Sequence, residues 1–76
     1  MVQIQEFPVV DVIASMVRTE RRRQHMDQRT LALVANVAVR SVHRIENAEP
    51  TVRLDTVLKV LGALGVEIQL HPRERR

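Results

Sequence analysis

Two short amphipathic segments joined by a three-residue turn constrain the fold of this chain more than any other feature. Apolar residues at helical spacing predict a helix over residues 28–35, with Asp27 as its N-cap. A second helix is expected over about 39–47, and Asn36 between them tolerates the left-handed backbone that ends a helix. Two helices this short, linked by so tight a turn, cross at a steep angle in a helix-turn-helix arrangement.

A further helical segment lies on each side of this pair. Apolar residues recur at intervals of three and four from about residue 10 to residue 24 and again over 54–64, where Gly65 is a natural stop. In the first segment Val12, Ile13, Met16 and Val17 recur at this spacing. The residues expected on the buried faces of the other three helices are Leu31, Ala32, Ala35, Val42, Ile45, Leu54, Val57, Leu58, Leu61 and Leu64. The pattern therefore predicts four helices packed around an aliphatic core.

Residues 66–70, which follow the helices, alternate between apolar and polar side chains and so predict a short strand. Its apolar side consists of Val66, Ile68 and Leu70. Because a lone strand leaves its backbone groups unpaired, we expect it to pair with residues 2–5 or with the same strand of a second copy. The expected divisions are an N-terminal arm or short strand (1–8), a helix-turn-helix domain (9–65), a dimerisation strand (66–70) and a tail (71–76).

Length and composition narrow the function classes. A chain of 76 residues forms one domain. Phe7 is its single aromatic residue, whereas modules for single-stranded nucleic acids stack bases on several rings. There is no cysteine and no metal-ligand spacing among the histidines, so we expect no disulfide, metal or other cofactor. Without a signal peptide or a long apolar run, we expect a cytoplasmic protein.

The charge distribution permits nucleic-acid binding. The formal net charge is +3, but residues 18–44 hold seven arginines and two acids. Arginine suits bidentate recognition of phosphate or guanine, although a charge run alone is also compatible with a solvated helix face. Catalysis is not expected, because Ser41 and His43 are two positions apart and point to different sides of one helix.

Residues 21–48 carry a family resemblance. They read RRRQHMDQRTLALVANVAVRSVHRIENA, which matches without a gap the pattern RxxxGLTQxxLAxxAGVSxxTVxRIENG. This segment resembles the helix-turn-helix of the Cro and phage-repressor type, the XRE class. The closer resemblance is to HipB-like antitoxins, which also end in Ala-Leu-Gly-Val and a short strand, here residues 63–70.

The resemblance implies a fold class and a function. The fold expected is all-α, a compact four- to five-helix repressor-like domain with a short C-terminal β-strand used in dimerisation. The function expected is that of a transcriptional repressor that binds double-stranded DNA sequence-specifically as a homodimer. The chain would be the autoregulating antitoxin of a HipBA-like pair and would also bind a HipA-like kinase toxin. Two alternatives stay open. One is a stand-alone regulator of the phage or restriction-modification controller type, and the other is a protein-interaction module that has lost DNA binding.

The resemblance also assigns site residues by position. The residues that match the family's DNA contacts are Gln28, Arg29, Val39, Arg40, Ser41, His43 and Arg44. Gln28 matches the family's glutamine, which touches a phosphate and braces the recognition helix. Arg40 and Arg44 are four positions apart and point into the groove together, and which of them reads a base and which holds a phosphate stays open. Arg21 and Glu46 match an ion pair that some phage repressors bury, and we expect it to form here.

Some residues of this segment are unusual for the family. Leu33 and Val34 are apolar where the family is polar, which indicates either a contact for the toxin or ordinary exposed apolar residues. Ala38 replaces the usual Ser or Thr cap of the second helix of the motif. His25 and Ala48 replace glycines, so the backbone is strained there if it has a positive φ.

Overall fold

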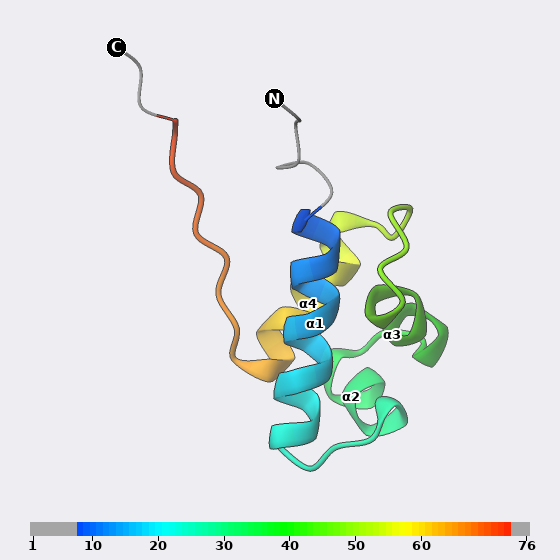
Figure 1. The fold of residues 1–76 in the computed structure, drawn as a ribbon. Coiled ribbons are helices and arrows are strands. Elements are labelled where there is room, and N and C mark those ends of the chain that lie inside the picture. Colours follow the sequence, from blue (N-terminus) through cyan, green and yellow to red (C-terminus); the bar gives the residue numbers. More distant parts are fainter. Residues whose placement is uncertain (1–7, 74–76) are drawn as a thin grey trace.

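The computed structural model describes residues 8–73. Its helices are α1 (Pro8–Arg23), α2 (Gln28–Ala35), α3 (Val39–Glu46) and α4 (Leu54–Leu64). In Figure 1 the short pair α2 and α3 lies to one side of the longer α1 and α4. α1 packs against α3 and α4, and α2 packs against the same two helices, so the pair is fixed to the rest of the domain through both of its members.

The predicted helices are confirmed, and their ends agree closely with the sequence pattern. The helices predicted over 28–35 and 54–64 have the predicted bounds. α1 begins earlier than expected, at Pro8, because proline is well suited to the first turn of a helix, where its missing N–H has no partner to lose. α3 ends at Glu46, with Asn47 as its C-cap.

All of these helices end in the same backbone motif. A residue with positive φ reverses the chain, and the next residue donates a backbone hydrogen bond to the carbonyl five positions earlier. The reversing residues are His25, Asn36, Ala48 and Gly65, with φ of 60°, 60°, 59° and 77°. The bonds run from Met26 to Arg21, Val37 to Ala32, Glu49 to Arg44 and Val66 to Leu61, over 2.9 to 3.0 Å. The strain expected at His25 and Ala48 is therefore present.

The core is aliphatic, and the α2–α3 pair contributes its predicted residues. The buried apolar residues are Ala14, Val17, Leu31, Ala32, Ala35, Val42, Ile45, Val60, Leu61 and Leu64. Every apolar residue predicted to be buried in α2 and α3 is in this set. Leu31 and Val42 are completely buried, so these short helices are held by side chains that interlock with the rest of the domain.

The predicted burial is wrong on part of α4, and α1 also exposes apolar residues. Val12 and Met16 are exposed on α1, and Leu54 and Leu58 are 68% and 48% exposed on α4, whereas Val60 is completely buried. The apolar arc of each helix is wider than the arc that its neighbours cover. A chain of this length has too few elements to enclose a helix on several sides.

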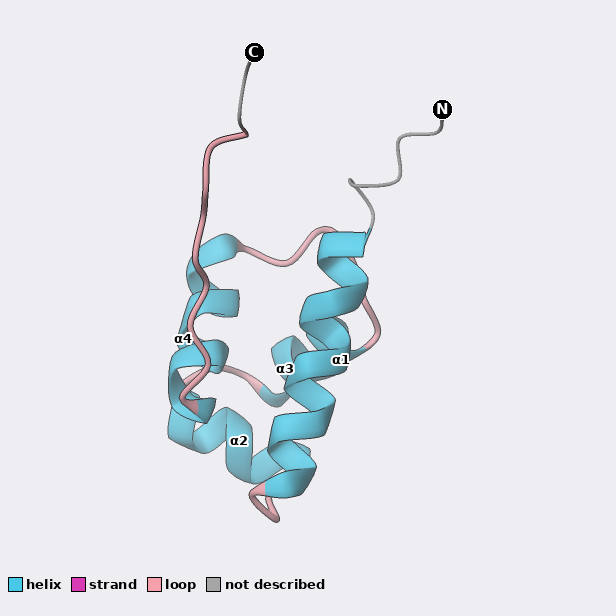
Figure 2. Ribbon diagram, turned by 60° about the vertical axis from the view of Figure 1, so that its left-hand side comes forward, coloured by secondary structure: helices cyan, strands magenta, loops and turns pink. Residues whose placement is uncertain are grey.

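The strand predicted over 66–70 is not formed, and no strand occurs within residues 8–73. The segment leaves α4 at Gly65 and extends toward the end of the molecule where α1 begins, without a ladder partner (Figure 2). A strand needs such a partner, and the residues described in a single chain do not supply one. The predictions for residues 1–7 and 74–76 lie outside the described residues.

Candidate nucleic-acid interface

α3 has a buried face and an exposed basic face. Val42, Ile45 and Glu46 are buried, whereas Arg40, His43 and Arg44 are exposed. The structure thus places the predicted arginines and His43 together on the outer face of one helix. Val39 is also on the exposed part, and Ser41 is half-buried.

The beginning of α3 lacks the cap that the beginning of α2 has. Ala38 has extended dihedral angles and makes no side-chain cap hydrogen bond, as expected from its methyl side chain. At α2, the carboxylate of Asp27 accepts a hydrogen bond from the backbone N–H of Thr30 over 2.7 Å. That backbone hydrogen bond lowers the pKa of Asp27. The first turn of α2 therefore starts on a fixed backbone, next to the exposed Arg29.

The predicted ion pair between Arg21 and Glu46 is formed and buried. The Nε atom of Arg21 donates to Oε2 of Glu46 over 2.7 Å, and Nη2 donates to Oε1 over 3.0 Å. Nη1 of Arg21 donates to the carbonyl oxygen of Met26 over 3.0 Å. A bidentate pair with its remaining nitrogen also bonded is the geometry in which a buried charge pair is tolerated.

Glu46 connects three helices through its carboxylate and its carbonyl. Besides Arg21 from α1, its carboxylate accepts a hydrogen bond from Nε2 of Gln28, at the start of α2, over 2.9 Å. Arg18 of α1 donates to the Glu46 carbonyl at the end of α3 over 2.6 Å. Burial opposes ionisation of Glu46, but the hydrogen bonds from Arg21 and Gln28 outweigh it and hold its pKa below the usual value. α3 is thereby fixed against α1 and α2.

Gln28 makes the bracing contact that its match to the family's glutamine implies. Its side chain is half-buried and its amide N–H group points to Glu46, so it braces the end of α3 from the start of α2. Arg18 is a residue that the pattern missed, because its contact with the Glu46 carbonyl joins positions far apart in the sequence. This contact leaves no periodic signal in a single sequence.

The remaining predicted contact residues lie away from this network. Leu33 and Val34 are exposed on the outer side of α2, Leu33 to 80%. Ile68 and Leu70 are exposed in the extended segment, whereas Val66 packs against the core of its own chain. Of the residues predicted for dimerisation, Ile68 and Leu70 are therefore the available ones.

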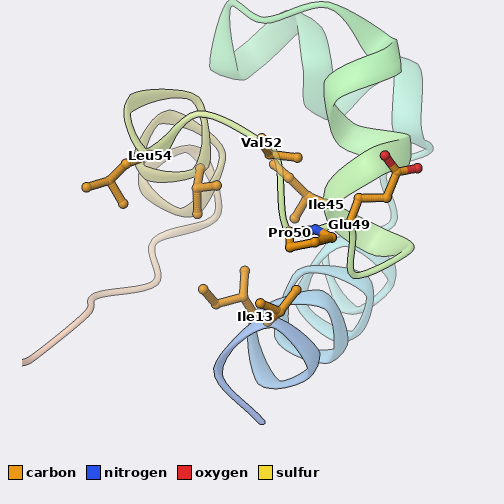
Figure 3. A pocket seen from close by; sticks show the side chains of 8 residues that line it. Ile13, Ile45, Glu49, Pro50, Val52 and Leu54 are labelled. Carbon is orange, nitrogen blue, oxygen red and sulfur yellow. The ribbon is translucent and has the colours of Figure 1, made fainter. Parts of the chain in front are cut away.

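A small apolar cavity lies between the start of α1, the end of α3 and the start of α4 (Figure 3). It holds about 170 Å³ and is lined by Val10, Ile13, Ile45, Glu49, Pro50, Val52, Leu54 and Val57. None of the residues predicted to contact DNA lines it. Across residues 8–73 no cluster of potential metal ligands occurs, and no helix is long and apolar enough to cross a membrane.

Two short helices that are joined by a tight turn and packed against each other, the second with a basic exposed face, define the helix-turn-helix class. The model of the helix-turn-helix family matches residues 17–70, and the chain belongs to this family. One relative is the HTH-type transcriptional regulator y4mF of Sinorhizobium fredii (strain NBRC 101917 / NGR234), itself described as uncharacterised. The two are 42% identical over 65 residues, which cover 84% of this chain and 86% of the relative.

Proposed function

We propose that this chain is a sequence-specific DNA-binding transcriptional repressor and not an enzyme. One observation carries the proposal: α3 presents Arg40, His43 and Arg44 to solvent while a buried network holds its other face. A helix of this kind fits the major groove, which admits one α-helix. The name of the relative, a transcriptional regulator, supports the same role.

The exposed residues of α3 suit base and phosphate contacts. An arginine matches the O6 and N7 atoms of guanine with two hydrogen bonds, and a valine methyl suits the methyl group of thymine. Arg40 and Val39 lie in the first turn of α3, the part of a recognition helix that enters the groove deepest. Arg29 is exposed at the start of α2, and we expect it to contact the phosphate backbone.

We further propose that the working species is a homodimer. The large apolar residues exposed on α1, α4 and the extended segment are Val9, Val12, Met16, Leu54, Leu58, Ile68 and Leu70. Each of these side chains exposes an area on the order of 100 Å², so together they approach the ~800 Å² per partner that a standard interface buries. In a dimer, the segments 66–70 of the two copies have the ladder partner that each lacks alone. Such a dimer reads half-sites about 34 Å apart.

The proposal includes an antitoxin role, for which the exposed Leu33 and Val34 supply a contact surface for a HipA-like kinase. The rival is a stand-alone regulator without a toxin. A pull-down with the kinase separates the two. Capture by the wild type and loss of capture by Leu33→Glu support the antitoxin. If both capture the kinase equally, Leu33 does not contact it, and if neither does, the stand-alone regulator is favoured.

Fluorescence anisotropy on a duplex from the gene's own upstream region tests DNA binding, with a scrambled duplex as control. Between ~50 and ~200 mM salt, binding to the upstream duplex should exceed binding to the control by at least ~10³. A dimer that touches six to eight phosphates gives a log–log salt slope of about −5 to −7. No binding to either duplex at low salt contradicts the proposal and favours the protein-interaction module.

A further inference from the structure

The four helix ends share one backbone motif but differ in the residue that follows the reversal. After α1, α2 and α4 this residue is Met26, Val37 or Val66, and each of them packs against the hydrophobic core. After α3 it is Glu49, which is exposed. An apolar residue is usual here, because it packs over the last turn of the helix. The acidic residue occurs at the end of the helix that is proposed to enter the major groove.

The backbone fixes Glu49 next to a recognition-helix arginine. The strained φ of 59° at Ala48 turns the chain back, and the N–H of Glu49 donates to the carbonyl of Arg44 over 3.0 Å. Oε1 of Glu49 then lies 3.6 Å from Nε of Arg44, an ion pair slightly longer than a hydrogen bond. In Figure 3 the Glu49 carboxylate points away from the apolar residues of the cavity that it borders.

The two recognition arginines therefore differ in their surroundings. Arg40 has no ion-pair or hydrogen-bond partner for its side chain within residues 8–73, whereas Arg44 has Glu49. The other acid at the end of α3, Glu46, already bonds to Arg21 and Gln28. Contact with Glu49 through Nε leaves the two terminal nitrogens of Arg44 free, and these form a fork that matches guanine or phosphate.

We propose that Glu49 is a specificity-determining residue that acts through Arg44. The proposal rests on the function proposed above. At the operator, Glu49 holds the Arg44 fork toward the groove, so that less side-chain freedom is lost on binding. On other sequences the fork finds no matching base, and the negative charge of Glu49 opposes the approach of phosphates. The contribution to folding is small, because both side chains are about half exposed, at 47% and 45%.

The test is Glu49→Gln, assayed on the upstream and the scrambled duplex. Affinity for the scrambled duplex should rise about threefold, since a charge near the phosphates is removed, while affinity for the upstream duplex should not rise. The ratio of the two affinities should therefore fall at least ~3-fold. Asp11→Asn is the matched control, because it removes the same charge from an exposed residue outside α2, α3 and their turn.

A second comparison separates positioning from bulk charge. In an Arg44→Lys background the fork is absent, so Glu49→Gln should change the affinity for both duplexes alike. The fall in the ratio of the two affinities should then disappear. Melting temperatures should stay within ~2 °C of the wild type, as expected for exposed ion-pair residues.

The possible outcomes distinguish this inference from the proposed function. If the wild type prefers the upstream duplex and Glu49→Gln leaves the ratio of the two affinities unchanged, the proposed role of Glu49 is overturned. The proposed repressor function is not affected by that result. An equal effect of Asp11→Asn, or an effect unchanged by Arg44→Lys, overturns the role of Glu49 in the same way. Equal binding of both duplexes by the wild type removes the proposed function and this inference together.

Discussion

α3 and α4 pack on the same core but present opposite chemistry to solvent. The outer face of α3 carries Arg40, His43 and Arg44, and that of α4 carries Leu54 and Leu58. A charged face suits a polyanion, whereas an apolar face suits another apolar surface. The comparison suggests that the two helices serve different partners, DNA for α3 and a second copy for α4. Each prediction below tests one side of this comparison against a stated control.

The largest expected effect comes from the support behind α3. Arg21→Met leaves the buried Glu46 carboxylate without its bidentate partner, which should cost about 3–5 kcal/mol of unfolding free energy. Thermal or urea unfolding measures the change. Asp55→Asn, which breaks the exposed pair with Arg53 at the start of α4, should leave the midpoint nearly unchanged. Equal losses in the two variants would contradict the special role of the buried pair.

Acid should reveal the same network. The folded-state pKa of Glu46 is lowered, so its stabilising contribution is complete above the unfolded-state pKa and is lost as pH falls through the folded-state value. Wild-type melting temperature should therefore drop below about pH 4. The Glu46→Gln variant has no carboxylate to titrate at this position. Its melting temperature should be lower than that of the wild type at neutral pH and should fall less steeply as the pH is lowered. Parallel pH profiles would show that Glu46 does not contribute.

On the outer face of α3, Arg40→Ala should weaken operator binding about 10- to 100-fold per half-site and relax specificity at one base pair. The reason is the loss of a two-pronged contact from the first turn of the helix. Anisotropy with a set of single-base-pair variants of the operator measures both effects. The matched control is Arg73→Ala, which removes an exposed arginine of the tail and should change affinity about threefold or less. A uniform loss across all operator variants would assign Arg40 to phosphate instead.

On the outer face of α4, Leu54→Glu should weaken the proposed dimer about 30-fold, because a large apolar contact is replaced by a charge. The monomer should stay folded, since this position is exposed and an acid is favourable in the first turn of a helix. Sedimentation equilibrium measures the dimer constant. Leu33→Glu, on α2, should leave that constant unchanged. A monomeric wild type, or an equal effect of both variants, would refute the assignment of α4 to the dimer.

The same contrast explains how far the sequence predicts the structure. The bounds of α2 and the buried residues of the α2–α3 pair could be predicted, because these apolar residues are covered by their own chain. On α4, burial of Leu54 and Leu58 was predicted and is wrong, since periodicity shows that a face is apolar and not what covers it. The pair of Glu49 with Arg44 could not be predicted either. It depends on the positive φ of Ala48, where a family glycine is absent.

The smallest effect tests the ends of the two helices. Ala48 and Gly65 occupy the same position in the same motif, after α3 and α4, both at positive φ. Glycine adopts this conformation without the steric penalty of a Cβ atom, so Ala48→Gly should stabilise the fold by about 0.5–1 kcal/mol, and Gly65→Ala should destabilise it by about 1 kcal/mol. For a domain of this size the shifts in Tm are roughly 2–8 °C and opposite in sign. Calorimetry measures both, and Tm shifts of the same sign would show that the two helix ends do not share one conformation in solution.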